Sequence, residues 1–445
     1  MTSRLDSFPV YFSRTTDPPN SIALPDSFFA TMSLSPEQVQ LIKATVPVLQ
    51  EHGLTITKLF YDNMLNAHPE LRVVFNVSNK VHGHQPMALA GALFAYASHI
   101  DNLGVLSPAV ARICHKHASL YIQPDQYEIV GKFLLEAMGL VLGDALTPPI
   151  LDAWAAAYWQ LAKLMIGIEA DLYKSAEGWT DFRDFRVAQK VPESDVITSF
   201  YFEPVDGKPL PPFIPGQYVS IQIDVPQLSH AQCRQYSLSD QPNPTYYRIS
   251  VRKDAGLDTS NPEAPAHPGY VSNILHSSVN VGDIVKLSHP YGDFRLENAD
   301  ATTPLVLISA GVGLTPLTAM VNSLTGSSST RPIHFIHGAH TGASRAFGPA
   351  IAALAQRIPT LRTTNFFTVP GENDKEGVDY DFVGHVDVAK LDGDKDLFLG
   401  DKQAEYYVCG PTSFMVDTKK ALVARGVDEA RVHMELFGTG GVPAA

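Results

Sequence analysis

The spacing of hydrophobic positions changes twice along the chain. From Ser35 to about Tyr173, apolar residues recur three and four positions apart, as they do on one face of an α-helix. A polar residue followed by proline, a pattern typical of helix starts, occurs at Ser35, Ser107, Gln123 and Thr147. No convincing strand pattern interrupts this stretch. We therefore predict an all-α domain over residues 33–176.

Short alternating stretches rich in β-branched and aromatic residues replace the helical pattern near Gly178. Glycines and prolines separate these stretches, as in an antiparallel β-barrel. We predict such a barrel over residues 177–299, with strands at 195–203, 217–225, 246–252 and 283–287.

A continuous apolar strand at 305–309 begins a third pattern, in which strands alternate with helices. This alternation predicts a doubly wound α/β domain with a parallel sheet over residues 300–445. The expected strands are 305–309, 333–336, 363–369 and 406–408, and the expected helices are 317–324, 347–357 and 413–425.

Composition narrows the class of protein. The 445 residues carry a net charge of −13, which argues against a nucleic-acid partner. No run approaches the roughly 20 apolar residues of a membrane helix, so we expect no integral membrane segment. The three cysteines, Cys114, Cys233 and Cys409, are far apart, which indicates neither a disulfide framework nor a zinc site and favours a reducing compartment.

Residues 1–32 have no helical pattern and no apolar core of a secretory signal. Arg4, Arg14 and several serines are typical of a mitochondrial presequence, whereas three aspartates argue against one. We expect a disordered extension of a cytoplasmic protein, or a folded protein that begins at Met32. Mitochondrial targeting stays an alternative.

Three motifs in the predicted barrel supply groups that a bound flavin needs. Arg234-Gln235-Tyr236-Ser237 supplies a cation for a phosphate, an aromatic ring and a hydroxyl. Gly269 and Ser272 lie at the start of a helix, which favours a pyrophosphate, and Tyr218 follows a turn that can aim its ring. A surface arginine beside a barrel tyrosine, and an ordinary helix cap, are the simpler interpretations. Together and in this order, the motifs resemble the FAD domain of the ferredoxin–NADP reductase superfamily.

Two further motifs follow strands of the third domain. Gly311-Val312-Gly313-Leu314-Thr315-Pro316 frees backbone N–H groups for a phosphate, and we expect Pro316 to begin the next helix. Cys409-Gly410-Pro411 ends a second strand, and ligands bind at such strand ends. The superfamily uses these two loops for the nicotinamide nucleotide, and Phe437 and Gly438 resemble its segment that brings an aromatic to the flavin. No acid follows the second strand, and Arg345 lies nearby, so the choice between NADH and NADPH stays open.

The helical domain precedes a reductase, whose electrons need an acceptor. A heme bound by the helical domain is the natural candidate. No Cys-x-x-Cys-His motif is present, so a heme would bind non-covalently through one axial side chain. His117 lies on an apolar stripe with Val110 and Cys114. On this pattern alone a buried core histidine is the simpler interpretation, and His115 and His99 compete as ligands.

The whole helical segment resembles the globin domain of flavohemoglobins, and the resemblance runs in family order over about residues 33–440. The matching helical stretches are 43–49, 60–64, 66–71, 74–76, 95–97, 115–117, 126–131 and 151–154. It continues through residues 181–183 and every reductase motif above.

The resemblance implies a role for each matching residue. His117 would be the proximal iron ligand, and Tyr127 and Glu169 would form the hydrogen-bond relay behind it, which makes the imidazole more electron-donating. Tyr61, Gln85 and Leu89 would line the distal side, where a phenol donor stabilises partial negative charge. The remaining implied contacts are Phe75 at the porphyrin edge and Lys116 and Glu435 between heme and flavin.

The function that the resemblance implies is that of a nitric oxide dioxygenase with heme b, FAD and NAD(P)H as cofactors. NAD(P)H would reduce FAD, FAD would pass single electrons to the heme, and NO and O₂ would become nitrate. We expect a monomer whose partners are these small molecules. The alternatives are an oxygen or NO carrier or sensor, and a general heme–flavin reductase of peroxides or artificial acceptors.

Overall fold

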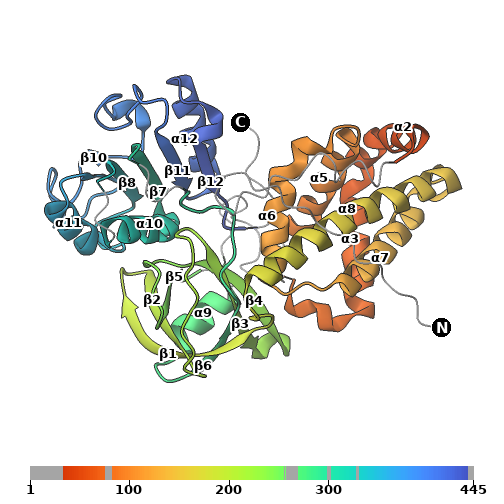
Figure 1. Cartoon of the computed structure of the whole chain (residues 1–445), viewed down its shortest axis with the longest axis horizontal. Helices are drawn as coiled ribbons and strands as arrows, with labels where there is room; N and C mark the ends of the chain where they lie inside the picture. The colour runs from red at the N-terminus through yellow and green to blue at the C-terminus, as the bar shows by residue number, and fades with distance from the viewer. Residues whose placement is uncertain are drawn as a thin grey trace. The chain divides into compact units, whose positions relative to one another are not determined.

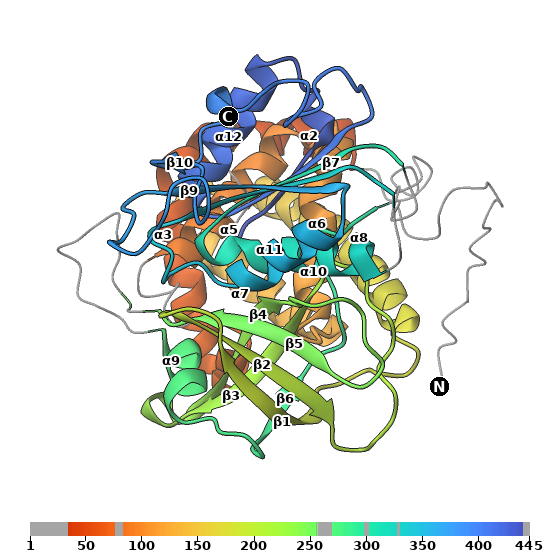
Figure 2. The same cartoon turned by 90° about the vertical axis from the view of Figure 1, so that its left-hand side faces the viewer.

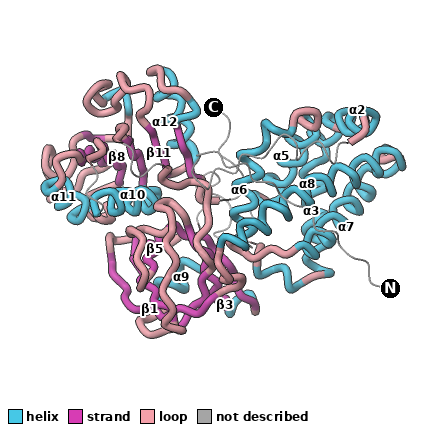
Figure 3. The backbone as a smooth tube through the Cα atoms, viewed as in Figure 1, coloured by secondary structure: helices cyan, strands magenta, loops and turns pink. Residues whose placement is uncertain are grey.

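The structure is a computed structural model, and it describes residues 34–75, 83–254, 256, 269–297, 302–326 and 330–438. The expectations for residues 1–32 and for Asn76 therefore lie outside the described residues. Figures 1 and 3 show a helical body, a barrel of strands and an α/β layer structure in chain order. None of the described helices is both long and apolar enough to cross a lipid bilayer.

The helical body confirms the predicted all-α domain. Ser35 caps its first helix: the hydroxyl accepts the Gln38 N–H, and the Gln38 side chain accepts the Ser35 N–H. Ser107 is already inside its helix, so its hydroxyl does not act as the expected cap. The helices are α2 (Pro36–Ala44), α3 (Val46–Ala67), α5 (His84–Ser98), α6 (Ser107–Ala118), α7 (Pro124–Leu142) and α8 (Pro148–Ser175), joined in part by the 3₁₀ turns η1 (Pro69–Val73), η2 (Leu103–Leu106) and η3 (Gly143–Ala145).

The barrel is antiparallel, as predicted, with strand order β4-β3-β6-β1-β2-β5. A bridge between Leu238 and Ile249 joins the region after β4 to β5 and so connects the two outer strands. A single core of phenylalanine and branched side chains fills it. The elements are β1 (Arg183–Pro192), β2 (Ile197–Pro204), β3 (Tyr218–Val225), η4 (Pro226–Leu228), β4 (His230–Ser237), β5 (Tyr247–Arg252), α9 (Tyr270–Ser277) and β6 (Ile284–Leu287).

The third domain is the predicted parallel sheet, in the order β10-β9-β8-β7-β11-β12. Its strands are β7 (Leu305–Ala310), β8 (Ile333–Ala339), β9 (Leu361–Phe367), β10 (Phe382–Val383), β11 (Glu405–Cys409) and β12 (Val432–Glu435). Its helices are α10 (Leu314–Gly326), α11 (Gly348–Arg357) and α12 (Thr412–Ala424), with the 3₁₀ turns η5 (Gly311–Gly313), η6 (Val388–Lys390) and η7 (Glu429–Arg431).

Alternate residues of β7 point to opposite faces of this sheet. Leu305 and Leu307 pack with residues of α10 and α11, whereas Val306 and Ile308 pack with residues of α12. Figure 2 shows these helices on opposite sides of the sheet. The sheet is thus covered on both faces, which explains why the four residues from Leu305 to Ile308 of β7 are all apolar.

One detail of the prediction was wrong. Pro316 does not begin its helix, because α10 starts two residues earlier at Leu314, directly after η5. The tight 3₁₀ turn over the two glycines lets the helix begin sooner than proline alone would indicate.

Candidate functional site

His117, Tyr127 and Glu169 come together from three helices, α6, α7 and α8. Nδ1 of His117 lies 2.8 Å from Oε1 of Glu169 and 3.0 Å from the Tyr127 hydroxyl. The Tyr127 hydroxyl donates to the same Glu169 oxygen at 2.6 Å. Glu169 is only 2% exposed, so these donors replace the water that a buried carboxylate needs. Burial and the adjacent Glu169 both raise the pKa of Tyr127, which keeps the phenol a proton donor.

The two competing histidines are engaged elsewhere. Nδ1 of buried His115 accepts the backbone N–H of Gly292 at 3.2 Å, and burial lowers the pKa of His115 to about 4. Nδ1 of His99 lies 3.0 Å from the carbonyl oxygen of Ala95 in its own helical turn. Of the three, only His117 has a buried carboxylate as partner of one ring nitrogen, and its other nitrogen, Nε2, is in none of these bonds.

Tyr61, Phe75, Gln85 and Leu89 form the second group in the helical body. Tyr61 is buried, and its ring meets that of Phe75 edge-on with centroids 5.5 Å apart. Leu89 packs against the same hydrophobic cluster. Burial raises the pKa of Tyr61, and the Gln85 side chain partly opposes this rise. Among the residues that the structure describes, Oε1 of Gln85 is buried without a hydrogen-bond partner.

The register of the barrel brings two of the expected flavin motifs side by side. β3 pairs with β4 so that Tyr218 lies opposite Ser237, Val219 opposite Tyr236 and Ser220 opposite Gln235. Arg234 follows in the same ladder, and its guanidinium donates to the carbonyl oxygen of Cys233 at 2.7 Å. Burial raises the pKa of Tyr236, so its phenol stays neutral.

The ring of Tyr218 lies where the barrel meets α6. A Cβ atom on Gly292, whose φ is +132°, would lie 3.0 Å from this ring, so only glycine fits without displacement. The ring packs in a cluster with Ala118, the residue after His117, and with Tyr291. The Tyr218 hydroxyl is buried and makes no hydrogen bond to any described residue.

Gly269 and Ser272 lie at the start of α9, as expected. Gly269 is the N-cap residue, and the Ser272 hydroxyl donates back to its carbonyl oxygen at 2.9 Å. A Cβ on Gly269 would lie 2.7 Å from the Asp254 side chain, which explains the need for glycine. The first N–H groups of α9 are therefore presented on a compact turn, an arrangement that suits a phosphate.

The two expected nucleotide loops touch each other. β7 and β11 are neighbours, and β7 is the strand at which the sheet order reverses. A Cβ on Gly313 would lie 2.1 Å from the carbonyl oxygen of Cys409. Gly311 takes a φ of +54°, which opens the turn, and a Cβ on Gly410 would lie 2.6 Å from the Phe414 ring. Both glycine-containing loops thus meet at the topological switch point, where α/β sheets bind nucleotides.

Val312, Leu314, Thr315 and Pro411 complete these loops. Thr315 is buried, and its hydroxyl donates to the Val312 carbonyl oxygen at 3.1 Å, which ties the turn to the helix. Leu314 packs in the core under α10. Pro411 is the N-cap residue of α12.

Lys116, Glu435, Phe437 and Gly438 gather where α6 meets the end of β12. Nζ of Lys116 donates to the carbonyl oxygen of Gly438 at 2.6 Å. Burial raises the pKa of Glu435 to about 7, and nearby Asp293 adds to the rise while Lys116 opposes it. Phe437 is 44% exposed, so its ring has room to receive a partner.

Several residues that join the helical body to the barrel have no recognisable pattern in the sequence. The Ser220 hydroxyl donates to Ser119 Oγ at 2.9 Å, and the Gln235 side chain reaches the same oxygen at 3.4 Å. The Tyr121 hydroxyl accepts the His289 N–H at 3.0 Å. Serine and tyrosine are common in loops and helix ends, and no spacing pattern distinguishes these from their neighbours.

Comparisons with known proteins agree with this arrangement. Residues 58–165 match the family model of the globins, and residues 307–420 match that of the oxidoreductase NAD-binding domain. A flavohemoglobin from Malassezia yamatoensis, solved as a crystal structure with bound FAD and heme, is 31% identical. The alignment covers 91% of this chain and 100% of that one, with a TM-score of 0.79.

Curated relatives extend the similarity over nearly the full length. The flavohemoprotein of Bordetella parapertussis is 48% identical over 414 residues, which cover 92% of this chain and 100% of that protein. The flavohemoprotein of Rhizobium meliloti is 47% identical over 410 residues, which cover 91% of this chain and 98% of that protein. The chain therefore belongs to the flavohemoprotein family.

Proposed function

We propose that the chain is an NAD(P)H-dependent nitric oxide dioxygenase, an oxidoreductase that converts NO and O₂ to nitrate. The observation that carries the proposal is the His117–Tyr127–Glu169 triad in a chain that also contains both reductase motifs. A carrier of oxygen or NO needs no reductase in the same chain. The proposed domains are the globin at 33–176, the FAD barrel at 177–299 and the NAD(P) domain at 300–445, after an extension at 1–32.

The residues of the helical body fit a heme. The Glu169 carboxylate accepts a hydrogen bond from Nδ1 of His117. This bond fixes the imidazole proton on Nδ1 and leaves the lone pair of Nε2 for iron. Two buried polar groups lie in an otherwise apolar cluster, as a site for a polar iron-bound ligand requires: the Tyr61 hydroxyl, and the side-chain amide of Gln85, whose Oε1 has no partner among the described residues. Phe75 and Leu89 supply the apolar lining.

The residues of the other two domains fit FAD and a nicotinamide nucleotide. We assign Tyr218, Arg234, Gln235, Tyr236, Ser237, Gly269 and Ser272 to FAD, and the loops 311–316 and 409–411 to the nucleotide. Lys116, Glu435, Phe437 and Gly438 would lie between heme and flavin. When bound, the flavin splits the two electrons of a hydride into single electrons, and the heme iron supplies the centre at which O₂ and NO react.

The chain's own groups then have distinct tasks. Glu169 holds the imidazole of His117 in one orientation and increases its electron donation through Nδ1. Tyr127 donates to Glu169 and so holds the carboxylate in place. Tyr61 donates a hydrogen bond where negative charge develops, and the buried surroundings strengthen that bond because water is excluded.

The test is consumption of NO by the purified holoprotein. We expect NO loss to require both NAD(P)H and O₂, and nitrate to be the product. NO loss that is independent of either one would contradict the proposal.

A second measurement addresses the ligand. His117→Ala should lose the normal heme spectrum and still oxidise NAD(P)H with an artificial electron acceptor. An unchanged heme spectrum would refute the assignment of His117.

We also propose that the protein is a cytoplasmic monomer. The absence of a spanning helix in the described residues is compatible with this localisation. Cell fractionation and light scattering of the purified protein test the two statements separately. A mitochondrial fraction would favour the presequence alternative for residues 1–32.

A further inference from the structure

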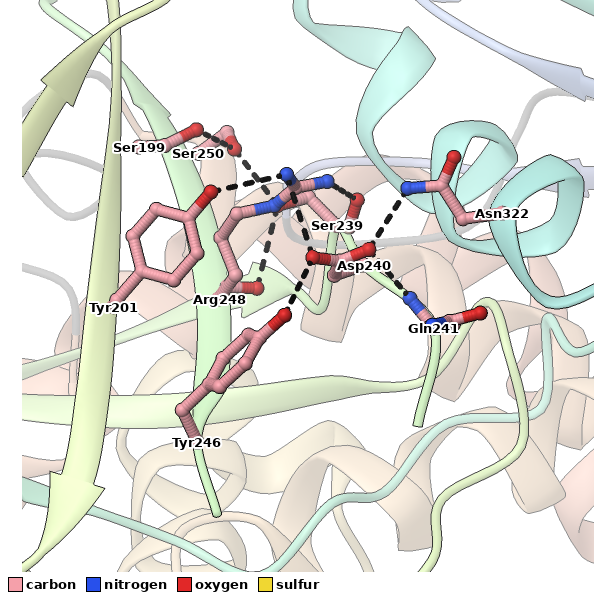
Figure 4. A network of polar contacts seen from close by, with 9 residues as sticks. All are labelled: Ser199, Tyr201, Ser239, Asp240, Gln241, Tyr246, Arg248, Ser250 and Asn322. Carbon is pink, nitrogen blue, oxygen red and sulfur yellow. Dashed lines mark hydrogen bonds and ion pairs between the residues drawn. The ribbon is translucent and has the colours of Figure 1, made fainter. Parts of the chain in front are cut away.

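A polar cluster lies between the barrel and the parallel sheet, and none of the roles proposed above uses it. It combines one arginine, one aspartate and seven neutral polar side chains (Figure 4). We call it the Arg248 cluster; its members are Ser199, Tyr201, Ser239, Asp240, Gln241, Tyr246, Arg248, Ser250 and Asn322.

Arg248, on β5, is 8% exposed although it carries a charge. Its Nε donates to the Ser239 hydroxyl at 3.1 Å, its Nη2 donates to the Ser239 carbonyl oxygen, and its Nη1 donates to the Tyr201 hydroxyl at 3.3 Å. The cation also lies over the ring of Phe347, with Cζ 4.9 Å from the centroid. Since Phe347 belongs to the core of the parallel-sheet domain, Arg248 contacts both domains.

Asp240 makes the second connection. One carboxylate oxygen accepts the Asn322 side-chain N–H at 2.8 Å and the Gln241 backbone N–H at 2.9 Å. The other accepts the Tyr246 hydroxyl at 3.1 Å and lies 3.5 Å from Nη1 of Arg248. Asn322 is on α10, so this bond crosses from the barrel to the other domain.

The two ends of this connection start close to the two ligand motifs. Asp240 follows Ser237, the last residue of the flavin motif, by three positions. Asn322 lies on the helix that begins at Leu314, directly after the nucleotide turn Gly311–Gly313. The hydrogen bond between Asp240 and Asn322 therefore links the loop that directly follows β4, the strand of one motif, to α10, the helix that begins in the other.

Such a cluster is better suited to orientation than to net stability. Burial of an arginine and an aspartate has a desolvation cost that can offset their attraction, whereas their hydrogen bonds are directional. Apolar contacts between the domains tolerate sliding, whereas the directional hydrogen bonds of this network weaken when their donors and acceptors shift. The backbone of Phe347 also indicates one fixed orientation. This residue, whose ring lies under Arg248, has a φ of +55°, which a bulky residue keeps only when its surroundings hold it.

We propose that Asp240, Arg248 and Asn322 are positioning residues for hydride transfer. They fix the orientation of the nucleotide-carrying helix against the flavin-carrying strand, so that a hydride leaves the dihydronicotinamide, which is oxidised, and reaches the flavin, which is reduced. The proposal rests on the function proposed above and adds three residues to which that function assigns no role.

The experiment uses the full-length holoprotein under anaerobic conditions, with NADH as the reductant. Asn322→Leu removes the cross-domain bond and keeps the side-chain size. Thr325→Val is the matched control, because within the described part of the chain the Thr325 hydroxyl bonds only to carbonyl oxygens of its own helix, those of Val321 and Asn322. Stopped-flow absorbance gives the limiting rate of flavin reduction and the NADH concentration at half saturation.

We expect Asn322→Leu to lower the limiting rate at least about ten-fold, because small misplacements of oriented groups are costly in rate. Half saturation should stay near the wild-type value. The long-wavelength charge-transfer absorbance of flavin with bound nucleotide should weaken, and hydrogen exchange of the segment around Asp240 should quicken even without nucleotide. Thr325→Val should match the wild type in all four measurements.

Asn322→Asp provides an independent comparison if Asn322→Leu does not yield FAD-loaded protein. Its carboxylate faces Asp240, so the limiting rate should fall further, and the exchange Asn322→Asp with Asp240→Asn should restore part of it. A wild-type limiting rate in the variants, or a change in half saturation alone, overturns the positioning role. If NADH and NADPH both fail to reduce the wild-type flavin, the proposed function itself is wrong.

Discussion

Gly313→Ala tests the contact between the two nucleotide loops. The added methyl group would lie 2.1 Å from the carbonyl oxygen of Cys409 and 2.7 Å from the backbone nitrogen of Gly410. Cβ contacts shorter than 3.0 Å are essentially never found, so the loops must separate by about 0.9 Å or more. Both partners are backbone atoms at the end of a paired strand and cannot rotate away as a side chain would.

The magnitude follows from that displacement. When reacting groups are held in a fixed geometry, a shift of about 1 Å lowers the rate about a hundred-fold. We therefore expect the limiting rate of flavin reduction by NADH to fall by about two orders of magnitude. The heme and FAD spectra, and flavin reduction by dithionite, should remain those of the wild type, because neither depends on the nucleotide loops.

Anaerobic stopped-flow bleaching of the flavin measures this rate. Gly400→Ala is the control within the same domain, since the one described atom within 4 Å of a Cβ there is Asp394 Oδ1, at 3.8 Å. A Gly313→Ala protein that is reduced by NADH at the wild-type rate, with wild-type half saturation, would show that the loop contact does not position the nucleotide.

Three further predictions concern single residues. Glu169→Gln removes the anionic acceptor behind His117, so heme affinity should fall about 10- to 100-fold in a heme-transfer assay, and unchanged affinity would contradict the relay. Burial lowers the pKa of His337 to about 3, so the stability that its neutral form contributes is present above about pH 6.5 and is lost toward pH 3. Urea unfolding of His337→Gln should show a shallower acid dependence, by up to about 1.4 kcal/mol per pH unit, and a dependence equal to that of the wild type would argue against this residue. Gly131→Ala places a methyl group 2.4 Å from the Tyr158 ring and should lower the free energy of unfolding by about 1–3 kcal/mol. Thermal or urea unfolding measures this loss, and an unchanged midpoint would mean that the ring moves aside freely.

The spacing of apolar residues predicted the fold class of each of the three domains, because each domain repeats its own spacing many times. The strand β1, by contrast, was not recognised from the sequence. Its register shifts between Val187 and Gln189, and this bulge breaks the alternation that identifies a strand. The edge strands β10 and β12 were also missed, because they are only two and four residues long.

The site shows a different limit. The glycine-rich loops were visible because a turn at a strand end requires particular residues over a short stretch. The partnership of His117 with Tyr127 and Glu169 joins three helices, and no period relates positions 10 and 52 residues apart. Only family resemblance suggested it. The Arg248 cluster had no pattern at all, since its members come from two strands, the loop between β4 and β5, and one helix.

The order of the parallel strands also governs when the third domain can fold during synthesis. The helical body is made of local segments and is complete by Ser175, so it can fold while the rest of the chain is still being translated. β7 lies in the middle of its sheet, yet its neighbour β11 arrives about a hundred residues later, and β12 later still. Until β11 has been synthesised, β7 is therefore an apolar edge strand with one unpaired side. Such edges are prone to aggregation. Slower growth at low temperature should favour recovery of the intact sheet over that of the helical body alone.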